Sequence, residues 1–297
     1  MFKRYQSIEN HYQQKCLDFW LSLYPELEKE VFIIEEKLDG ANISIVLDEN
    51  NNVTWCKRSG KAEDNFMGLD KVKDQYEDLI EHLKIFNESG DGLQLYGEIF
   101  GPGIQKRINY GDEIQIRFFD MRAKSGDNLF YLHPVGLRNM GFIPVVKTLG
   151  HAVGLRDALE FDTRIENEHG SLIEGAVIKP MVKHYFSPKG ERFVLKKKNK
   201  EFLERPAKIV KLEINDEEFN KLRDAFLPYI NDNRVMSVFS KQGEISSPKQ
   251  IGDYLKSVMN DAKEDFEKDY GEVDRKLMSR VFKVANPRVV EILKEHL

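Results

Sequence analysis

The chain has 297 residues, of which 41% are hydrophobic and 32% are charged, and its formal net charge is −5. This length suits one large or two medium domains, and the composition is that of an ordinary globular protein. No apolar run is long enough to cross a membrane, and the first residues lack the apolar core of a signal peptide, so we expect a cytoplasmic protein. Cys16 and Cys56 are too few for a disulfide framework or a cysteine-based zinc site.

The first two thirds of the chain alternate strand and helix signals. Apolar spacing predicts helices over 8–23 and 76–86, and it predicts strands over 31–36, 41–47, 53–57, 92–99, 114–121, 175–179 and 192–198. Residues 133–168 show only short helical and loop signals. Beyond Pro206 the spacing is helical over 216–229, 248–266 and 273–297, and residues 232–245 resemble a helix followed by a turn. We therefore predict an α+β domain over residues 1–205 and a small all-α domain over residues 206–297.

The segment Lys37-Leu38-Asp39-Gly40 separates two of the predicted strands. A lysine at a strand end can attack a nucleotide phosphate if it is unprotonated, against a free pKa of about 10.4. Neighbouring cations lower such a pKa and also neutralise the phosphate under attack. The tetrapeptide alone is a weak signal, because its residues are common in a chain that is 32% charged.

A run of three lysines ends the last predicted strand. Lys196 and Lys198 alternate along it, so they share one face and can supply two positive charges there, whereas Lys197 points the other way. The alternative is an edge-strand charge cluster that blocks aggregation. Residues 192–211 hold eight Lys/Arg and two Glu, so we also expect a basic surface on this acidic chain.

Further polar and aromatic residues fit the same chemistry. Glu98 precedes a glycine-rich turn, where a carboxylate can accept ribose hydroxyls or hold a divalent cation. Glu174 and Lys179 are five residues apart, which on a regular strand puts them on opposite faces, one toward a metal and the other toward a phosphate or its neighbouring acid. Only one of Phe118 and Phe119 can face a purine. Each of these residues also has a purely structural interpretation, as a strand-end charge or a core side chain.

Other common site types are absent from the sequence. The seven histidines have no metal-ligand spacing, and neither a phosphate-binding loop of the P-loop type nor a nucleophile elbow occurs. Arg58, after the predicted hairpin, can bind a phosphate or ribose, or it can be a solvated turn residue.

Six segments in this order resemble the motifs of the covalent nucleotidyltransferase superfamily, which contains DNA ligases, RNA ligases and mRNA capping enzymes. Within it, the chain most resembles the RNA ligase 2 family of phage-type, ATP-dependent RNA ligases. The segments that carry the resemblance are residues 37–40, 57–60, 97–106, 118–120, 174–180 and 194–198. The N-terminal residues 2–5 and 9–12 and the tail segments 233–235 and 240–245 also resemble that family.

The resemblance implies a nucleotidyltransferase (ATP-grasp-like ligase) domain with antiparallel sheets, followed by a helical domain that binds RNA and takes part in end joining. Lys37 would take AMP from ATP with Mg²⁺ or Mn²⁺, and the AMP would pass to an RNA 5′-phosphate before a 3′-OH displaces it. The implied catalytic residues are Lys37, Glu174, Lys196 and Lys198. The implied nucleotide-binding residues are Glu36, Lys37, Leu38, Arg58, Glu98, Phe119, Lys179, Lys196 and Lys198. The implied RNA-binding residues are Asn42, Arg58, Arg234 and Lys241, and the implied metal ligands are Glu98 and Glu174.

One position departs from that family. Many members carry His where this chain has Asp39, whereas DNA ligases and capping enzymes usually carry Asp there. A small DNA ligase is therefore an alternative, but its β-rich OB-fold domain does not match the helical periodicity of residues 206–297. A non-catalytic nucleic-acid-binding protein is a second alternative, although it has no chemical reason to keep Lys37 and its partners together. We expect a monomer that acts on RNA ends or nicked duplex RNA, with no obligate protein partner and no membrane association.

Overall fold

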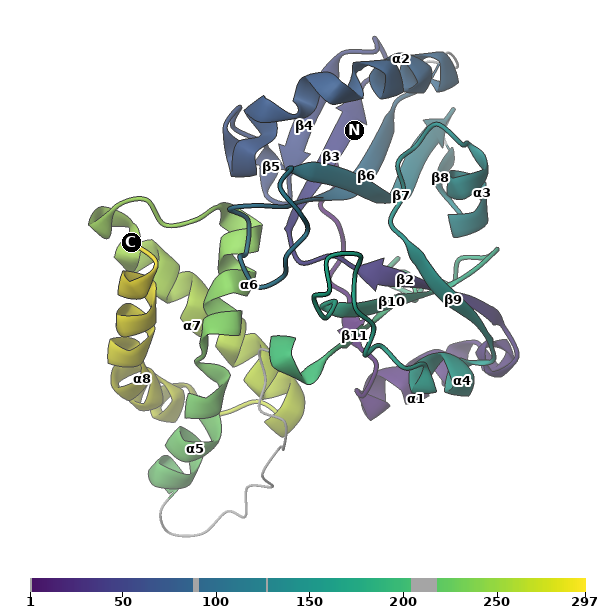
Figure 1. Cartoon of the computed structure of the whole chain (residues 1–297). Helices are drawn as coiled ribbons and strands as arrows, with labels where there is room; N and C mark the ends of the chain where they lie inside the picture. The colour runs from purple at the N-terminus through teal and green to yellow at the C-terminus, as the bar shows by residue number, and fades with distance from the viewer. Residues whose placement is uncertain (1, 88–90, 127, 204–217) are drawn as a thin grey trace. The chain divides into compact units, whose positions relative to one another are not determined.

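The computed structural model describes residues 2–87, 91–126, 128–203 and 218–297. The chain forms two compact units, Met1–Asn199 and Lys200–Leu297, each of which is described by itself (Figure 1). The predicted domain boundary between residues 205 and 206 lies outside the described residues. No helix in the described part of the chain is both long and apolar enough to cross a membrane.

The first unit contains two β-sheets. The five-stranded sheet has the order β1-β11-β10-β2-β9. Its strands are β1 (Glu9–Asn10), β2 (Val31–Lys37), β9 (Thr148–Val153), β10 (Gly175–Pro180) and β11 (Leu195–Lys198). Every pair is antiparallel except β1–β11.

The six-stranded sheet is antiparallel throughout, with the order β5-β4-β3-β6-β7-β8. Its strands are β3 (Ala41–Leu47), β4 (Val53–Lys57), β5 (Gly60–Lys61), β6 (Leu93–Phe100), β7 (Gln115–Ser125) and β8 (Asn128–Leu132). The helices of this unit are α1 (Gln14–Leu23), α2 (Glu77–Phe86), α3 (Pro134–Asn139) and α4 (Leu155–Glu160). Short 3-10 turns lie at Pro25–Glu28, Phe66–Lys71 and Lys73–Tyr76.

Helices cover one face of each sheet. The helices α1 and α4 lie on one side of the five-stranded sheet (Figure 1). They pack on alternate residues of its central strands, among them Phe32 and Ile178. In the six-stranded sheet, α2 packs on the face that carries Ile43 and Phe118. The other faces of the two sheets contact one another, as where Lys179 Nζ donates to the carbonyl of Phe119 over 2.7 Å. Because that space holds the charged side chains of the central strands, it is where a polar ligand can be bound.

Most predicted elements are confirmed, and three errors have clear causes. The helix predicted over 8–23 begins only at Gln14, because Glu9 and Asn10 pair with β11 in parallel register. The strand predicted over 192–198 begins at Leu195. The strands β8 and β9 were not expected, and both are sheet edges with half-exposed side chains, which weakens an alternating pattern.

The second unit is helical in the residues that are described. Its helices are α5 (Glu218–Phe226), α6 (Asp232–Gln242), α7 (Ile251–Tyr270) and α8 (Arg275–Glu295), with 3-10 turns at Lys200–Phe202, Leu227–Tyr229 and Pro248–Gln250. Asn231 caps α6 by accepting a hydrogen bond from the main-chain N–H of Arg234. The core gathers apolar residues from all four helices, including Phe226, Phe239, Phe266 and Val289.

Candidate active site

The register of three strands brings two lysines onto one face. Lys37 on β2 lies opposite Gly175 on β10, and Gly175 lies opposite Lys198 on β11. Residues that face each other across a ladder point to the same side of the sheet, so both lysines project from the face that carries no helix. Gly175 has no side chain to fill the space between them.

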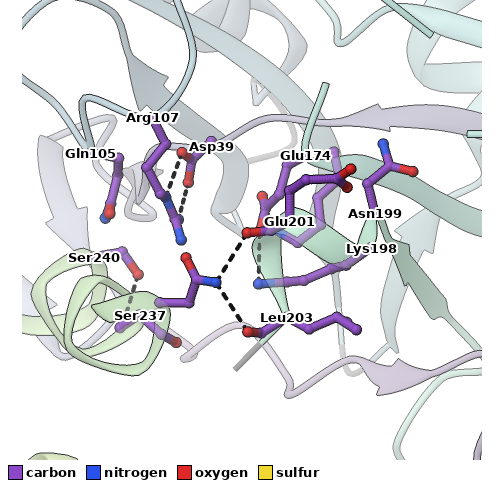
Figure 2. A network of polar contacts seen from close by, with 12 residues as sticks. Asp39, Gln105, Arg107, Glu174, Lys198, Asn199, Glu201, Leu203, Ser237 and Ser240 are labelled. Atoms are coloured by element: carbon purple, nitrogen blue, oxygen red, sulfur yellow. Dashed lines mark hydrogen bonds and ion pairs between the residues drawn. The ribbon is translucent and has the colours of Figure 1, made fainter. Parts of the chain in front are cut away.

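Glu174 occupies that space. Its Oε2 lies 2.6 Å from Lys37 Nζ. Its Oε1 lies 2.7 Å from Lys198 Nζ (Figure 2). Burial by itself raises the pKa of Glu174, but the positive charges of Lys198, Lys37 and Arg107 outweigh it and hold the pKa at about 2. Glu174 is therefore ionised at neutral pH, and the three groups together carry one excess positive charge that suits a phosphate.

The prediction that Glu174 and Lys179 lie on opposite faces is wrong. Gly175 has a φ of +151°, and a Cβ there would lie 2.0 Å from the carbonyl of Lys197, so the chain turns just before β10 begins. This turn brings Glu174 to the same face as Lys179. The Lys179 ammonium then pairs with Glu35 at 2.7 Å, which is the neighbouring-acid alternative considered from the sequence.

The alternation predicted for the three lysines is confirmed for the last two. Lys198 contacts Glu174, whereas Lys197 donates to the main-chain carbonyls of Leu159 and Phe161 at 2.7 and 2.8 Å. Lys196 lies opposite Val177 and so shares the face of Lys198. Within the basic surface predicted over 192–211, the side chains of Arg192 and Lys198 are buried, and residues 204–211 lie outside the described residues.

The six-stranded sheet contributes Glu98 from the end of β6. Asn42 of β3 lies opposite it and donates from its amide to the carbonyl of Gly97 at 3.3 Å. Burial raises the pKa of Glu98 to about 8, against the opposing positive charges of Lys37 and Arg58. Glu98 thus belongs to the same electrostatic cluster as Lys37 and can release a proton when a cation arrives.

Glu98 and Glu174 fit a divalent cation that takes its remaining ligands from a substrate. Mg²⁺ is commonly bound by one or two carboxylates together with phosphate oxygens and water. The described residues contain no group of three or more histidine, cysteine, aspartate or glutamate side chains that could hold a metal by themselves. That Glu98 and Glu174 are metal ligands remains a prediction.

Asp39 pairs with a residue that sequence reasoning missed. Arg107 Nε lies 2.9 Å from one carboxylate oxygen of Asp39 and its Nη2 contacts the other, so the pairing is bidentate (Figure 2). The side chain of Asp39 is 3% exposed and that of Arg107 is 19% exposed. Burial and the charge of Glu174 raise the pKa of Asp39, and Arg107 opposes both. Arg107 follows a glycine-rich loop, and its position in the sequence shows nothing of this contact.

A β-bulge exposes one of two adjacent phenylalanines to the site. Tyr96 lies opposite Asp120 and Gly97 lies opposite Phe118, so Phe119 is the extra residue of β7. Phe118 is fully buried in the core, while the ring of Phe119 meets Tyr5 at 5.1 Å. Phe119 is thus the ring that faces away from the core, as the sequence allowed.

An ion pair that sequence reasoning missed lies beside Phe119. Arg192 contacts both carboxylate oxygens of Asp120, through Nη1 at 3.1 Å and through Nη2, and Tyr5 donates its hydroxyl to the same carboxylate at 2.9 Å. Burial tends to raise the pKa of Asp120, but Arg192 and Lys179 lower it below its usual value. These contacts hold the middle of β7, next to the aromatic ring of Phe119.

Comparison with known families decides what this site belongs to. The sequence model of the RNA ligase family matches residues 30–198, more than half of the chain, and contains every residue of the lysine–glutamate cluster. The chain belongs to the RNA ligase family. The model of the T4 RNA ligase 2 C-terminal region matches residues 213–294, which accounts for the helical unit.

Solved RNA ligase structures share the fold. The Naegleria gruberi RNA ligase with PPi is 20% identical and superposes with a TM-score of 0.50 over 68% of this chain and 57% of its own. An apo mutant of the same ligase gives 18% identity and a TM-score of 0.50, covering 66% of this chain and 55% of that one. A mutant of the same ligase with AMP and Mn is 19% identical and gives a TM-score of 0.50, covering 68% of this chain and 57% of that one. The match thus spans little more than half of the Naegleria ligase, and the predicted α+β nucleotidyltransferase fold with its helical tail is confirmed.

Within this RNA ligase fold, other predicted nucleotide contacts lie around the cluster. Leu38 is buried in the turn after β2, and Arg58 follows β4, where its guanidinium donates to the Ser7 hydroxyl at 3.2 Å. Glu36 lies opposite Ala176, on the face away from Lys37, and its N–H donates to the carbonyl of Lys147 at 2.8 Å. Only the main chain of Glu36 remains suited to the predicted contact.

Arg234 and Lys241, which the resemblance implies as RNA contacts, both form ion pairs within the helical unit. Arg234 is 1% exposed, and its Nη1 bridges Asp261 and Asp265 at 2.6 and 2.7 Å. Lys241 pairs with the other oxygen of Asp261. Both side chains therefore hold α6 against α7, and Arg234 is too buried to contact RNA directly.

Proposed function

We propose that this chain is an ATP-dependent RNA ligase that forms a covalent lysyl-AMP intermediate on Lys37. The observation that carries the proposal is the placement of the Lys37 and Lys198 ammonium groups at 2.6 and 2.7 Å from the buried carboxylate of Glu174. Family membership supports it, as does the fold shared with a Naegleria ligase solved with PPi and with AMP and Mn.

In the first step Lys37 Nζ forms a bond to the α-phosphorus of ATP. The α–β phosphoanhydride bond breaks, and its electron pair leaves with pyrophosphate. Lys37 attacks in its neutral form, and the proton that it gives up passes to solvent, because Glu174, whose pKa is about 2, is too weak a base to keep it. Lys198 is placed to neutralise charge on the phosphates, since its ammonium shares the carboxylate that positions Lys37. Bound Mg²⁺ or Mn²⁺ would add charge neutralisation at Glu98 and Glu174.

The groups around the lysines suit the rest of the nucleotide. The Phe119 ring, exposed by the bulge, would stack on adenine, and Lys179 anchors its main chain through the Phe119 carbonyl. Glu98 and Arg58 would contact the ribose or the RNA end. Asn42 lies directly opposite Glu98 and would act in the later steps with RNA.

In the later steps AMP passes to an RNA 5′-phosphate, and a 3′-OH displaces it to seal the strand. We assign adenylation to the α+β unit and RNA binding to the helical unit, and nicked duplex RNA is the proposed substrate. We further propose that the protein acts as a monomer, in the cytoplasm, without an obligate protein partner.

The test is incubation with α-labelled ATP and Mg²⁺ followed by denaturing electrophoresis, with α-labelled GTP and labelled NAD in parallel. Label from ATP alone, lost in Lys37→Ala and kept in Lys197→Ala, is expected. Joining of a nicked RNA duplex is then compared with joining of the same nick in DNA. Absence of label from every nucleotide, in a folded protein that is not already adenylated, would refute the proposal, and joining of DNA alone would replace it with a DNA ligase.

A further inference from the structure

The charges of the helical unit are unevenly divided between its two long helices. Residues 251–270, which form α7, hold six Asp/Glu and three Lys. Residues 275–288, which form the first two thirds of α8, hold five Lys/Arg and no acid. The next acid in α8 is Glu291. One helix is therefore acidic, and its neighbour offers a wholly basic stretch.

Three cations of α8 lie on its solvent side. Arg280, Lys283 and Arg288 are all exposed, while Val281, Ala285 and Val289 on the opposite side are fully buried in the core. Arg280 and Lys283 are three residues apart and so are neighbours on the helix surface. The helical repeat thus separates an apolar face from a basic one.

The two helices also differ in how their charges are compensated. The cations on or beside α7 are largely paired: Lys263 with Glu267 at 3.3 Å, Lys268 with Glu264 at 3.0 Å, and Arg234 with two aspartates. By contrast, none of Arg280, Lys283 and Arg288 forms an ion pair with another residue that the structure describes. The guanidinium of Arg280 lies over the Phe219 ring, at 4.5 Å.

We infer that the exposed basic side of α8, formed by Arg280, Lys283 and Arg288, is where this unit contacts the phosphate backbone of the RNA substrate. Uncompensated, exposed cations on one helix face are complementary to a polyanion. This inference rests on the proposed RNA ligase function, and it replaces Arg234 and Lys241, which are engaged within the protein, as the RNA contacts of the unit.

The test measures binding of a nicked RNA duplex to the full chain, without ATP, over a series of salt concentrations. The double variant Lys283→Ala/Arg288→Ala removes two positive charges and leaves the Arg280–Phe219 contact intact. A matched control, Lys249→Ala/Lys256→Ala, removes two exposed lysines that lie off α8. Thermal unfolding shows that both variants are folded.

We expect the α8 variant to bind RNA more weakly than the wild type. The slope of log K against log salt is negative, and it should become less steep by about 2, since each lost phosphate contact reduces its magnitude by about 1. The control should bind as the wild type does. Equal binding by the α8 variant and the wild type overturns the inference, and so does an equal loss in both variants. Adenylation by labelled ATP is measured alongside and should be unchanged in the α8 variant. A wild-type protein that takes no label would instead refute the proposed function.

Discussion

Replacing Arg107 by Gln removes the cation that compensates Asp39 two residues after the proposed nucleophile. The Asp39 carboxylate is 3% exposed and is held bidentately by Arg107, with Nε at 2.9 Å. Breaking a buried ion pair by removing one partner typically costs about 3–5 kcal/mol, because a buried charge is left uncompensated. Arg107 is 19% exposed, so some water reaches the pair, and we expect the lower end, about 3 kcal/mol.

Removing the Asp39 carboxylate as well should recover much of the lost free energy of unfolding. In Asp39→Asn/Arg107→Gln no charge remains to be buried, so we expect at least about half of the 3 kcal/mol to return relative to Arg107→Gln. A matched control is Arg156→Gln, which breaks an exposed pair with Glu160 and should cost less than about 1 kcal/mol.

The effect also depends on pH. Burial and the charge of Glu174 already raise the folded pKa of Asp39, and Arg107 opposes that rise. Without Arg107 the folded pKa rises further above the unfolded one. Stability is then lost as pH rises through the interval between the two values, so the penalty of Arg107→Gln should be larger at pH 8 than at pH 5.

The assay is urea unfolding followed by tryptophan fluorescence. Trp20 and Trp55 are the only tryptophans of the chain and both lie in the first unit, so the signal reports on the unit that contains the pair. The reasoning fails if Arg107→Gln is as stable as the wild type, or if the double variant is no more stable than Arg107→Gln alone.

Three further predictions concern other parts of the molecule. Lys198→Ala should slow label transfer from ATP by about 100-fold and Lys197→Ala by far less, because only the former contacts the site carboxylate; equal losses in single-turnover assays would contradict the assigned faces. Gly175→Ala should lower the free energy of unfolding by more than about 2 kcal/mol, because the φ is +151° and the Cβ would meet a carbonyl; wild-type urea stability would contradict this. Burial would raise the pKa of Asp261, but Lys241 and Arg234 lower it, so its stabilisation is complete above its unfolded pKa of about 3.9 and is lost as pH falls through the folded value. Thermal unfolding of the wild type should therefore depend more steeply on pH below about 4 than that of Asp261→Asn, and parallel curves would count against this assignment.

The local sequence determined the helices and strands whose apolar residues recur with a clear period. It also determined which face of these elements the motif residues occupy. The strand Ala41–Leu47 and the helix Glu77–Phe86 agree with their apolar patterns, and the alternation of Lys197 and Lys198 follows from strand geometry alone. The position of Glu35 on the face of the site could also have been predicted, because it is two residues before Lys37 on the same strand and so shares its face.

Only the tertiary structure decided which charges meet. The partners Asp39 and Arg107 are 68 residues apart, and Asp120 and Arg192 are 72 apart, so no periodic pattern links them. The family resemblance implied that Arg234 contacts RNA, but the packing of α6 on α7 buries it between two aspartates. A local pattern records which face a side chain takes, whereas an ion pair depends on where the chain places the opposite charge. That is why the strands and the lysines could be predicted from sequence while their compensating partners could not.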